Sequence, residues 1–349
     1  MKIVVVGDIH VTADNFSKSA QGIKVNDKTI VPVEWRVKDK EEFQKKALNI
    51  EKNGPEAEPT ASGLLEEIED AELLLVHFAP VPRAVIEKAK RLKLIGTCRG
   101  GLEHIDVEAA TDKNIPVMHI IRNAEPVADF TIGLMIAETR NIARSHHAIM
   151  QGKWEKEFPN SGITTTFKEL KVGLVGLGHI GCLVARKLCA LGVEVLGYDP
   201  FVTPDSLLKK GINIKMTTIE DLFKESDIIS LHLRLTDDTQ NIIDKKLISL
   251  MKPTAYLVNT SRAGVLEEEA IVEALEKKKI AGAALDVFWE EPIPAGHPLL
   301  KLDNVTLTAH LAGDTVDAIP RSPKLLVEEI NKYLEKGFSE LIVNQNGIK

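Results

Sequence analysis

Residues 170–199 have the sequence LKVGLVGLGHIGCLVARKLCALGVEVLGYD, and this stretch decides the fold. The apolar run at 170–175 predicts a buried strand, and the helical pattern after it closes at Gly192. A second apolar run, residues 193–198, is followed by Asp199. A strand, a glycine-rich turn, a helix and a second strand together predict a βαβ unit of a parallel sheet.

The turn of this unit carries Gly176, Gly178 and Gly181 in the spacing G-x-G-x-x-G, which is typical of dinucleotide binding in this context. The first glycine permits a tight turn, the second lets the backbone approach a pyrophosphate, and the third lets the helix pack closely. Asp199 is placed to accept hydrogen bonds from a ribose 2′-hydroxyl and would repel a 2′-phosphate, which favours NAD over NADP. The alternative is an ordinary glycine-rich turn with no ligand.

Length and composition limit the kind of protein. A chain of 349 residues that is 44% hydrophobic can build two domains with real cores. Its net charge of −7 argues against nucleic acid or an anionic membrane as the main partner. No apolar run approaches membrane-spanning length, and no signal peptide is visible. The three cysteines, Cys98, Cys182 and Cys189, predict buried reduced thiols and no metal site. We expect a cytoplasmic protein.

The rest of the chain surrounds this unit. Residues 1–122 alternate short strand and helix patterns, which predicts an open parallel sheet, but Gly7 does not begin a phosphate loop. Residues 123–150 predict a long helical run that is broken near its start, and 323–336 predict a final helix.

The simplest domain organisation is an insertion. Residues 1–122 plus 318–349 form a discontinuous substrate domain, and residues 123–317 form an inserted NAD-binding Rossmann domain.

Three later loops follow predicted strands. They are Asn259–Gly264 (NTSRAG), Asp286–Pro292 (DVFWEEP) and Thr308–Gly313 (TAHLAG). Because ligands of open α/β sheets bind beyond the carboxyl ends of the strands, we expect these loops to face the same crevice as the glycine-rich turn.

Each loop supplies one residue that suits a hydride-transfer reaction. Arg262 can hold a carboxylate in bidentate fashion and polarise a neighbouring carbonyl. His310 can give or take the hydroxyl proton, and Glu291 can bond its far ring nitrogen and fix its tautomer. Beside a nicotinamide, these residues would interconvert a 2-hydroxy acid and a 2-keto acid.

Each of these residues also has a structural interpretation. His310 can be a turn residue, Glu291 a solvated loop acid, and Arg262 part of a surface ion pair. Asp286 could either cap its loop or touch the nicotinamide ribose.

With these motifs in this order, the chain resembles the D-isomer-specific 2-hydroxyacid dehydrogenases, D-3-phosphoglycerate dehydrogenase among them, from about Leu73 onward. The resemblance implies an α/β fold of two Rossmann-like or flavodoxin-like doubly wound parallel-sheet domains with the active site in the cleft between them. It also implies that Arg262, Glu291 and His310 are the catalytic triad. It further implies a homodimer joined through the NAD-binding domain, to which residues 123–150 contribute.

The resemblance adds expected ligand contacts. Arg99, Gly100 and Gly101 match the loop that binds the substrate, with the two glycine N–H groups as donors to its carboxylate, and Arg262 shares this role. The residues expected at the NAD cofactor are Gly176, Gly178, His179, Ile180, Gly181, Asp199, His232, Leu233, Arg234, Thr260, Ser261, Arg262, Asp286, His310 and Gly313.

The chain departs from the family pattern in places that affect the substrate. Many members have a longer loop where this chain has residues 101–104, and proline is common where Arg234 and Ala309 stand. Arg99 or Arg122 could bind a second anionic group, but a structural ion pair is the favoured interpretation. Two other functions stay open: an NAD(H)-sensing, corepressor-like binding protein, and a phosphite-type dehydrogenase on the same fold. The substrate acid is not identified.

Overall fold

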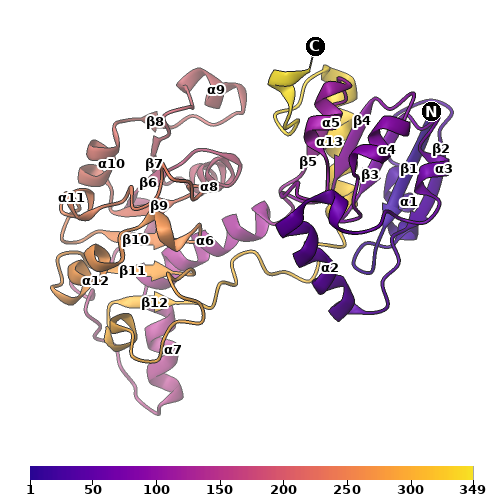
Figure 1. The fold of residues 1–349 in the computed structure, drawn as a ribbon. Coiled ribbons are helices and arrows are strands. Elements are labelled where there is room, and N and C mark those ends of the chain that lie inside the picture. Colours follow the sequence, from indigo (N-terminus) through magenta and orange to yellow (C-terminus); the bar gives the residue numbers. More distant parts are fainter. Residues whose placement is uncertain (349) are drawn as a thin grey trace. The chain divides into compact units, whose positions relative to one another are not determined.

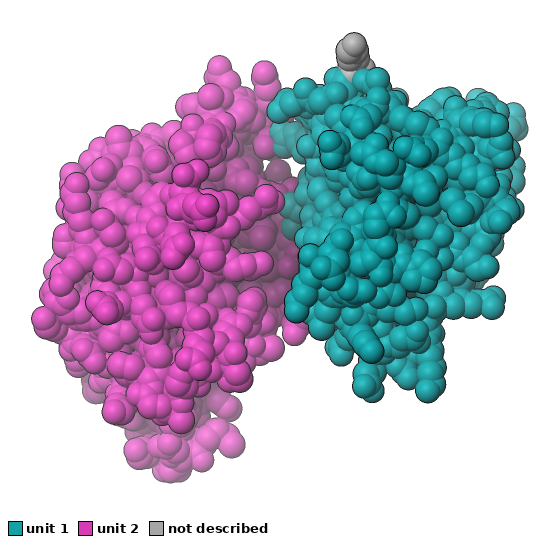
Figure 2. Space-filling view, in the orientation of Figure 1, with its two compact units in different colours: residues 1–122, 315–349 teal, residues 123–314 magenta. Residues whose placement is uncertain are grey.

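The computed structural model describes residues 1–348, which fold into two compact units (Figure 2). Unit 1 contains Met1–Arg122 together with the chain from Thr315 onward. Unit 2 is Asn123–Asp314, and it contains the glycine-rich stretch. Each unit is built around its own sheet.

The sheet of unit 1 has five parallel strands in the order β2-β1-β3-β4-β5. Its strands are β1 (Lys2–Gly7), β2 (Thr29–Glu34), β3 (Leu73–Val76), β4 (Leu94–Thr97) and β5 (Val117–His119). Side chains of β1 alternate between two cores: Val4 and Val6 pack on one face, while Ile3 and Val5 pack on the other. Both faces are therefore covered, which explains why the strands are apolar throughout.

The helices of unit 1 come from both ends of the chain. They are α1 (Ala13–Ala20), α2 (Lys40–Asn53), α3 (Leu64–Glu67), α4 (Arg83–Lys88), α5 (Val107–Asp112) and α13 (Ser322–Lys336). Helix α13, yellow in Figure 1, packs against α1 and buries Leu326 and Ile330 in the core on the sheet face that carries Ile3 and Val5. The C-terminal segment thus completes the first domain's core.

The sheet of unit 2 has seven parallel strands in the order β12-β11-β10-β9-β6-β7-β8. They are β6 (Lys171–Val175), β7 (Glu194–Tyr198), β8 (Lys215–Met216), β9 (Ile228–Leu231), β10 (Tyr256–Asn259), β11 (Gly282–Leu285) and β12 (Val305–Leu307). Neighbouring residues of β6, Leu174 and Val175, belong to different core clusters, so this sheet is also covered on both faces. The predicted α/β class with two doubly wound parallel sheets is confirmed.

Seven α-helices are described in unit 2: α6 (Ala124–Thr139), α7 (Ile142–Met150), α8 (His179–Ala190), α9 (Pro204–Lys209), α10 (Ile219–Glu225), α11 (Lys245–Ile248) and α12 (Glu268–Glu276). The long helical run predicted at 123–150 is broken, but not near its start. The break is at Asn141, whose φ of 57° is left-handed and which therefore ends one helix and begins the next.

The three cysteines differ in their exposure. Cys98 and Cys182 are buried, but Cys189 is exposed, so the prediction of three buried thiols is wrong for Cys189, which lies on the outer face of α8.

Of the helices within residues 1–348, none combines the length and the apolarity that a membrane span requires.

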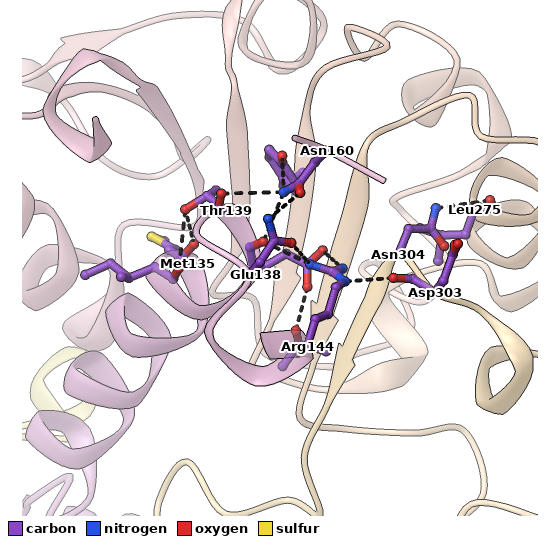
Figure 3. A network of polar contacts seen from close by, with 12 residues as sticks. Met135, Glu138, Thr139, Arg144, Asn160, Leu275, Asp303 and Asn304 are labelled. Atoms are coloured by element: carbon purple, nitrogen blue, oxygen red, sulfur yellow. Dashed lines mark hydrogen bonds and ion pairs between the residues drawn. The ribbon is translucent and has the colours of Figure 1, made fainter. Parts of the chain in front are cut away.

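A polar network inside unit 2 surrounds the helix break (Figure 3). Glu138 at the end of α6 is fully buried; it pairs with Arg144 of α7 and accepts a hydrogen bond from Thr306 Oγ1 of β12 at 2.6 Å. Burial raises the pKa of Glu138, and the charge of Arg144 opposes that rise. The network therefore ties the α6–α7 break to the strand that leads toward His310.

We expect Arg144→Ala to lower the free energy of unfolding by roughly 3 to 5 kcal/mol, since it leaves a buried carboxyl group unpaired. A carboxyl group with a raised pKa in the folded state stabilises the fold below that pKa and loses this contribution as the pH rises through it. The loss should therefore be larger at pH 8 than at pH 5. Urea unfolding at both pH values measures it.

The matched control is Lys245→Ala, which removes the exposed ion pair with Glu273. It should cost less than about 1 kcal/mol at either pH. An Arg144→Ala loss no larger than that of the control, or one independent of pH, would contradict this account of Glu138.

Candidate functional site

The turn between β6 and α8 accepts only glycine at two positions. Gly176 has a φ of 94°, and a Cβ there would lie 2.6 Å from the carbonyl oxygen of His232. A Cβ on Gly181 would collide with the carbonyl oxygen of Gly176. These residues therefore give the tight turn and the close helix approach expected from the glycine spacing.

The remaining glycine leaves room for a ligand. Gly178 is exposed, no atom lies within 4 Å of where its Cβ would be, and no side chain caps α8 at this residue. His179 and Ile180 form the first turn of α8 beyond it. An open helix N-terminus of this kind suits the approach of a diphosphate, so the turn fits a dinucleotide.

Asp199 follows β7 and is held beside the turn. Its Oδ2 accepts a hydrogen bond from Leu177 N at 2.8 Å, and its Oδ1 accepts one from Phe201 N at 2.9 Å. Each carboxylate oxygen has a second acceptor site, so both remain able to bond ribose hydroxyls. This observation fits NAD.

Other residues expected at the cofactor lie at the ends of β9 and β10. Burial lowers the pKa of His232 to about 4, so its ring is neutral near pH 7, and Nε2 lies 3.1 Å from Ser230 Oγ. Leu233 lies against Gly176, while Arg234 is exposed. Thr260 is buried, and its Oγ1 lies 2.7 Å from Thr131 Oγ1 of α6.

The loop after β10 is folded by Asn259, to which the sequence assigned no role. Its Oδ1 accepts hydrogen bonds from Ser261 N at 3.0 Å and Ser261 Oγ at 2.8 Å, and its Nδ2 donates to Arg262 O at 3.0 Å. The Arg262 side chain is exposed, and its Nη1 donates to Ser261 O at 2.7 Å. Asn259 is the last residue of β10, and an asparagine at a strand end is a common turn former, which was the signal in the sequence.

His310 and Glu291 form a pair. His310 Nδ1 lies 2.8 Å from Glu291 Oε2, and Glu291 Oε1 accepts a hydrogen bond from Phe288 N at 3.0 Å. The hydrogen bond with His310, and then that from Phe288, lower the pKa of Glu291. An ionised Glu291 requires a proton on His310 Nδ1, which leaves Nε2 to accept or donate the reacting proton.

The loop that carries His310 is anchored by Asp286, which follows β11 and is fully buried. Oδ1 accepts hydrogen bonds from Thr308 Oγ1 at 2.6 Å and Leu311 N at 2.9 Å, and Oδ2 accepts one from Ala312 N at 2.9 Å. His310 itself has a φ of 54°, an uncommon left-handed conformation for a residue other than glycine. Of the two roles considered for Asp286, these contacts are those of a loop cap.

One pocket in unit 2 brings the three expected catalytic residues together. Its volume is about 310 Å³. It is lined by Leu235, Arg262, Ala263, Gly264, Val287, Phe288, Trp289, Glu291 and His310. An arginine, a carboxylate–histidine pair and apolar walls can hold a small anion and exchange a proton with it. Gly313, further along the same loop, lies close to Asn123.

The residues expected to bind substrate through the family resemblance lie in unit 1, except Arg262. The Arg99 guanidinium lies 4.0 Å from the centre of the Phe78 ring, and its Nη2 lies 3.1 Å from Glu51 Oε1. The carbonyl oxygen of Gly100 lies 2.9 Å from His119 Nδ1. The carboxylate of Glu103 lies against Gly101.

Comparison with known proteins identifies the family. A family model described as D-isomer specific 2-hydroxyacid dehydrogenase, NAD binding domain, matches residues 132–312. The chain is 41% identical to D-3-phosphoglycerate dehydrogenase of Methanocaldococcus jannaschii over 83% of its length, but it spans only 55% of that protein. It is 38% identical to the glyoxylate reductase of Thermofilum pendens, over 83% of this chain and 86% of that one.

A solved structure agrees in fold. It is the NAD-complexed form of a D-isomer-specific 2-hydroxyacid dehydrogenase from Lactobacillus delbrueckii ssp. bulgaricus. The two structures match with a TM-score of 0.69 at 24% sequence identity, and the match covers 99% of this chain and 100% of that chain. This likeness shows the fold alone.

The family model, by contrast, covers more than half of the chain and confirms the prediction of NAD as the cofactor. The chain belongs to the family of D-isomer-specific 2-hydroxyacid dehydrogenases, which are NAD-dependent oxidoreductases.

Proposed function

We propose that this protein interconverts a 2-hydroxy acid and its 2-keto acid, with Arg262, Glu291 and His310 as its catalytic residues. The observation that carries the proposal is the shared pocket of these three side chains, in which Glu291 holds His310 Nδ1 at 2.8 Å. A carboxylate-bound imidazole beside an arginine is suited to proton exchange with a bound 2-keto acid.

Each residue has a separate task in the proposed reaction. Arg262 binds the substrate carboxylate and polarises the keto oxygen, which lowers the barrier to reduction. His310 donates its Nε2 proton to that oxygen as the alcohol forms, and takes it back in the reverse direction. Glu291 stabilises the protonated ring. Bound NADH supplies the hydride.

Replacing the proposed acid should separate catalysis from cofactor binding. We expect His310→Ala to lower kcat by about 100- to 10,000-fold, because the transition state loses its proton donor. NADH binding, measured by quenching of protein fluorescence, should change little. The assay is NADH oxidation with a panel of 2-keto acids that includes glyoxylate, hydroxypyruvate and phosphorylated acids.

The control is His146→Ala, since His146 is exposed on α7. It should turn over normally. Wild-type-like kcat in the His310→Ala variant would contradict the mechanism. If wild-type protein binds NADH but reduces no acid of the panel, the proposed reaction fails, and a binding role is favoured instead.

Asp286 acts in this proposal as a positioning residue for His310. Its three hydrogen bonds to the 308–312 loop hold that loop in the conformation that His310 needs to meet Glu291. An asparagine cannot accept through its amide nitrogen, so it cannot reproduce this set of bonds.

We expect Asp286→Asn to lower kcat by about 10- to 100-fold, since a displaced acid–base group meets the substrate poorly. The dissociation constant for NADH should stay close to that of the wild type. Asp303→Asn, which changes an exposed acid near β12, should leave both unchanged. A weakened NADH affinity with normal kcat would instead assign Asp286 to the cofactor.

We also propose that two copies associate through α7. Its surface carries exposed apolar side chains, including Met150, which is 73% exposed, and the nearby Trp154, which is 82% exposed. Exposed large apolar groups gathered on one segment are typical of a protein interface. A second copy of the chain is the partner that the family resemblance favours.

Light scattering after size-exclusion chromatography tests this interface. The wild type should have twice the mass of one chain, and Met150→Glu should shift it toward the monomer, because a charge in an apolar contact is costly. Leu48→Glu, at an exposed apolar residue of α2 in unit 1, should remain dimeric. A monomeric wild type would contradict the proposal.

A further inference from the structure

The strand that leads to His310 lies at the edge of its sheet. Strand β12 has 3 residues, Val305–Leu307, and among the described strands it pairs with β11 alone. Its backbone hydrogen bonds therefore hold it from one side, and segments held by few contacts open more easily than central strands. Because His310 follows shortly after β12, the position of this strand bears directly on the proposed acid–base group.

The side chains of β12 divide between the two faces of the sheet. Val305 and Leu307 pack against the core cluster that contains Leu285 of β11. Neighbouring residues of a strand point to opposite faces, so Thr306 points the other way, where its hydroxyl meets α6. Thr306 thus gives the edge strand a polar contact with a helix, in addition to its pairing with β11.

The partner of Thr306 on α6 is the carboxylate of Glu138. Glu138 Oε2 accepts a hydrogen bond from Thr306 Oγ1 at 2.6 Å, and both residues are buried. The other carboxylate oxygen pairs with Arg144. A Cβ on Gly282, the first residue of β11, would collide with this carboxylate. The glycine therefore leaves the room that the Glu138 side chain occupies between helix and sheet.

Arg144 extends these contacts to the chain just before β12. Its Nε donates a hydrogen bond to Asp303 O at 2.7 Å (Figure 3). Its Nη1 donates to Glu138 O at 3.1 Å and to Asn141 Oδ1 at 2.9 Å. The helix break and the start of β12 are thereby joined by side-chain contacts as well as by the fold of the backbone.

The ion pair of Glu138 with Arg144 is poorly suited to stabilise the fold by itself. Removing two charges from water costs about as much as their attraction returns, and apolar residues of similar size often stabilise a fold equally well. A buried pair with further hydrogen bonds does supply a fixed geometry, because each bond requires a particular length and angle. This favours a role of Glu138 in placing β12.

The placement continues from Thr306 to the histidine. Beyond β12, Thr308 Oγ1 donates a hydrogen bond to Asp286 Oδ1 at 2.6 Å. The imidazole of His310 then meets Glu291, with 2.8 Å between Nδ1 and Oε2. Because this short segment is bonded to its surroundings at each of these steps, a shift of β12 is passed on to the imidazole.

We propose that Glu138 and Thr306 are positioning residues for His310, because together they fix the edge strand β12 against α6. This inference rests on the proposed reaction for its effect on turnover, but not for its effect on the 308–312 loop. Displacing a catalytic group by about 1 Å can lower a rate about 100-fold, so even a slightly loosened β12 should be visible in kcat.

The loop is tested first, without cofactor or substrate. The amides of Leu311 and Ala312 donate to Asp286, and hydrogen–deuterium exchange followed by mass spectrometry reports how often these bonds open. We expect Thr306→Val to speed their exchange about 10-fold, since it removes the hydroxyl from a buried hydrogen bond to a carboxylate. Thr306→Ser keeps a hydroxyl and should exchange like the wild type.

Turnover is measured next, as reduction of glyoxylate or hydroxypyruvate by NADH. Thr306→Val should lower kcat about 10-fold, and Thr306→Ser should stay close to the wild type. The dissociation constant for NADH should not change, because the glycine-rich turn follows β6, and β11, β10 and β9 lie between β6 and β12. Thr306→Val and Asp286→Asn loosen the same loop, so their effects on kcat should not add in the double variant.

The control is Thr111→Val in unit 1. Thr111 Oγ1 donates to Val107 O at 2.7 Å and accepts from Asn344 Nδ2 at 3.1 Å, so this substitution also removes a bonded threonine hydroxyl. It should lower the thermal unfolding midpoint to a similar degree, while kcat and the exchange of the 308–312 loop stay unchanged. An equal loss of kcat in Thr111→Val would assign the effect to general destabilisation and would overturn the positioning role.

The outcomes separate this inference from the proposed reaction. Normal kcat in a folded Thr306→Val variant overturns the positioning role and leaves the reaction intact. Unchanged exchange of Leu311 and Ala312 overturns it as well. Faster exchange that Thr306→Ser restores, in a protein that reduces no keto acid, supports the placement of the loop and contradicts the proposed reaction. If Thr306→Val does not fold, Thr306→Ala takes its place, because it removes the hydroxyl without adding a methyl group beside Glu138.

Discussion

The buried carboxylate of Asp286 is the interaction on which the candidate site most depends. Three hydrogen bonds from the 308–312 loop compensate its desolvation, and they fold that loop tightly enough to hold His310 at a positive φ. In this conformation the imidazole meets Glu291, which comes from the segment after Asp286 itself. The acid–base pair is therefore a consequence of one buried capping residue and of the parallel pairing of β11 with β12.

The same construction recurs along both sheets. A short polar residue at the end of a strand holds the next loop. Asn259, the last residue of β10, bonds the backbone of Ser261 and Arg262. Asp8, directly after β1, contacts His77, which in turn contacts Arg122. Parallel strands bring these loops to one edge of each sheet, where the backbone of the strands is rigid and the loops can differ. Chemistry in this protein is thus placed by strand ends, with helices serving to bury the two faces.

What the sequence could predict follows from the range of the forces involved. The βαβ unit at Gly176 and Asp199 depends on local spacing, so both the fold class and the cofactor were accessible. The grouping of Arg262, Glu291 and His310 followed from strand order and the family resemblance. The helix break at Asn141, the exposure of Cys189 and the hydrogen-bond chain from Asp8 to Arg122 depend on tertiary contacts between distant segments, which periodicity does not encode.

Hydride transfer itself is the most direct test of the account. The protein is incubated with a 2-keto acid such as hydroxypyruvate and NADH that carries deuterium at the transferable C4 position of the nicotinamide. The account predicts a D-2-hydroxy acid with one deuterium on C2, detected by mass spectrometry and chiral chromatography. A product without that deuterium, a product of the L configuration, or NADH that stays bound and unoxidised across the keto-acid panel would contradict it.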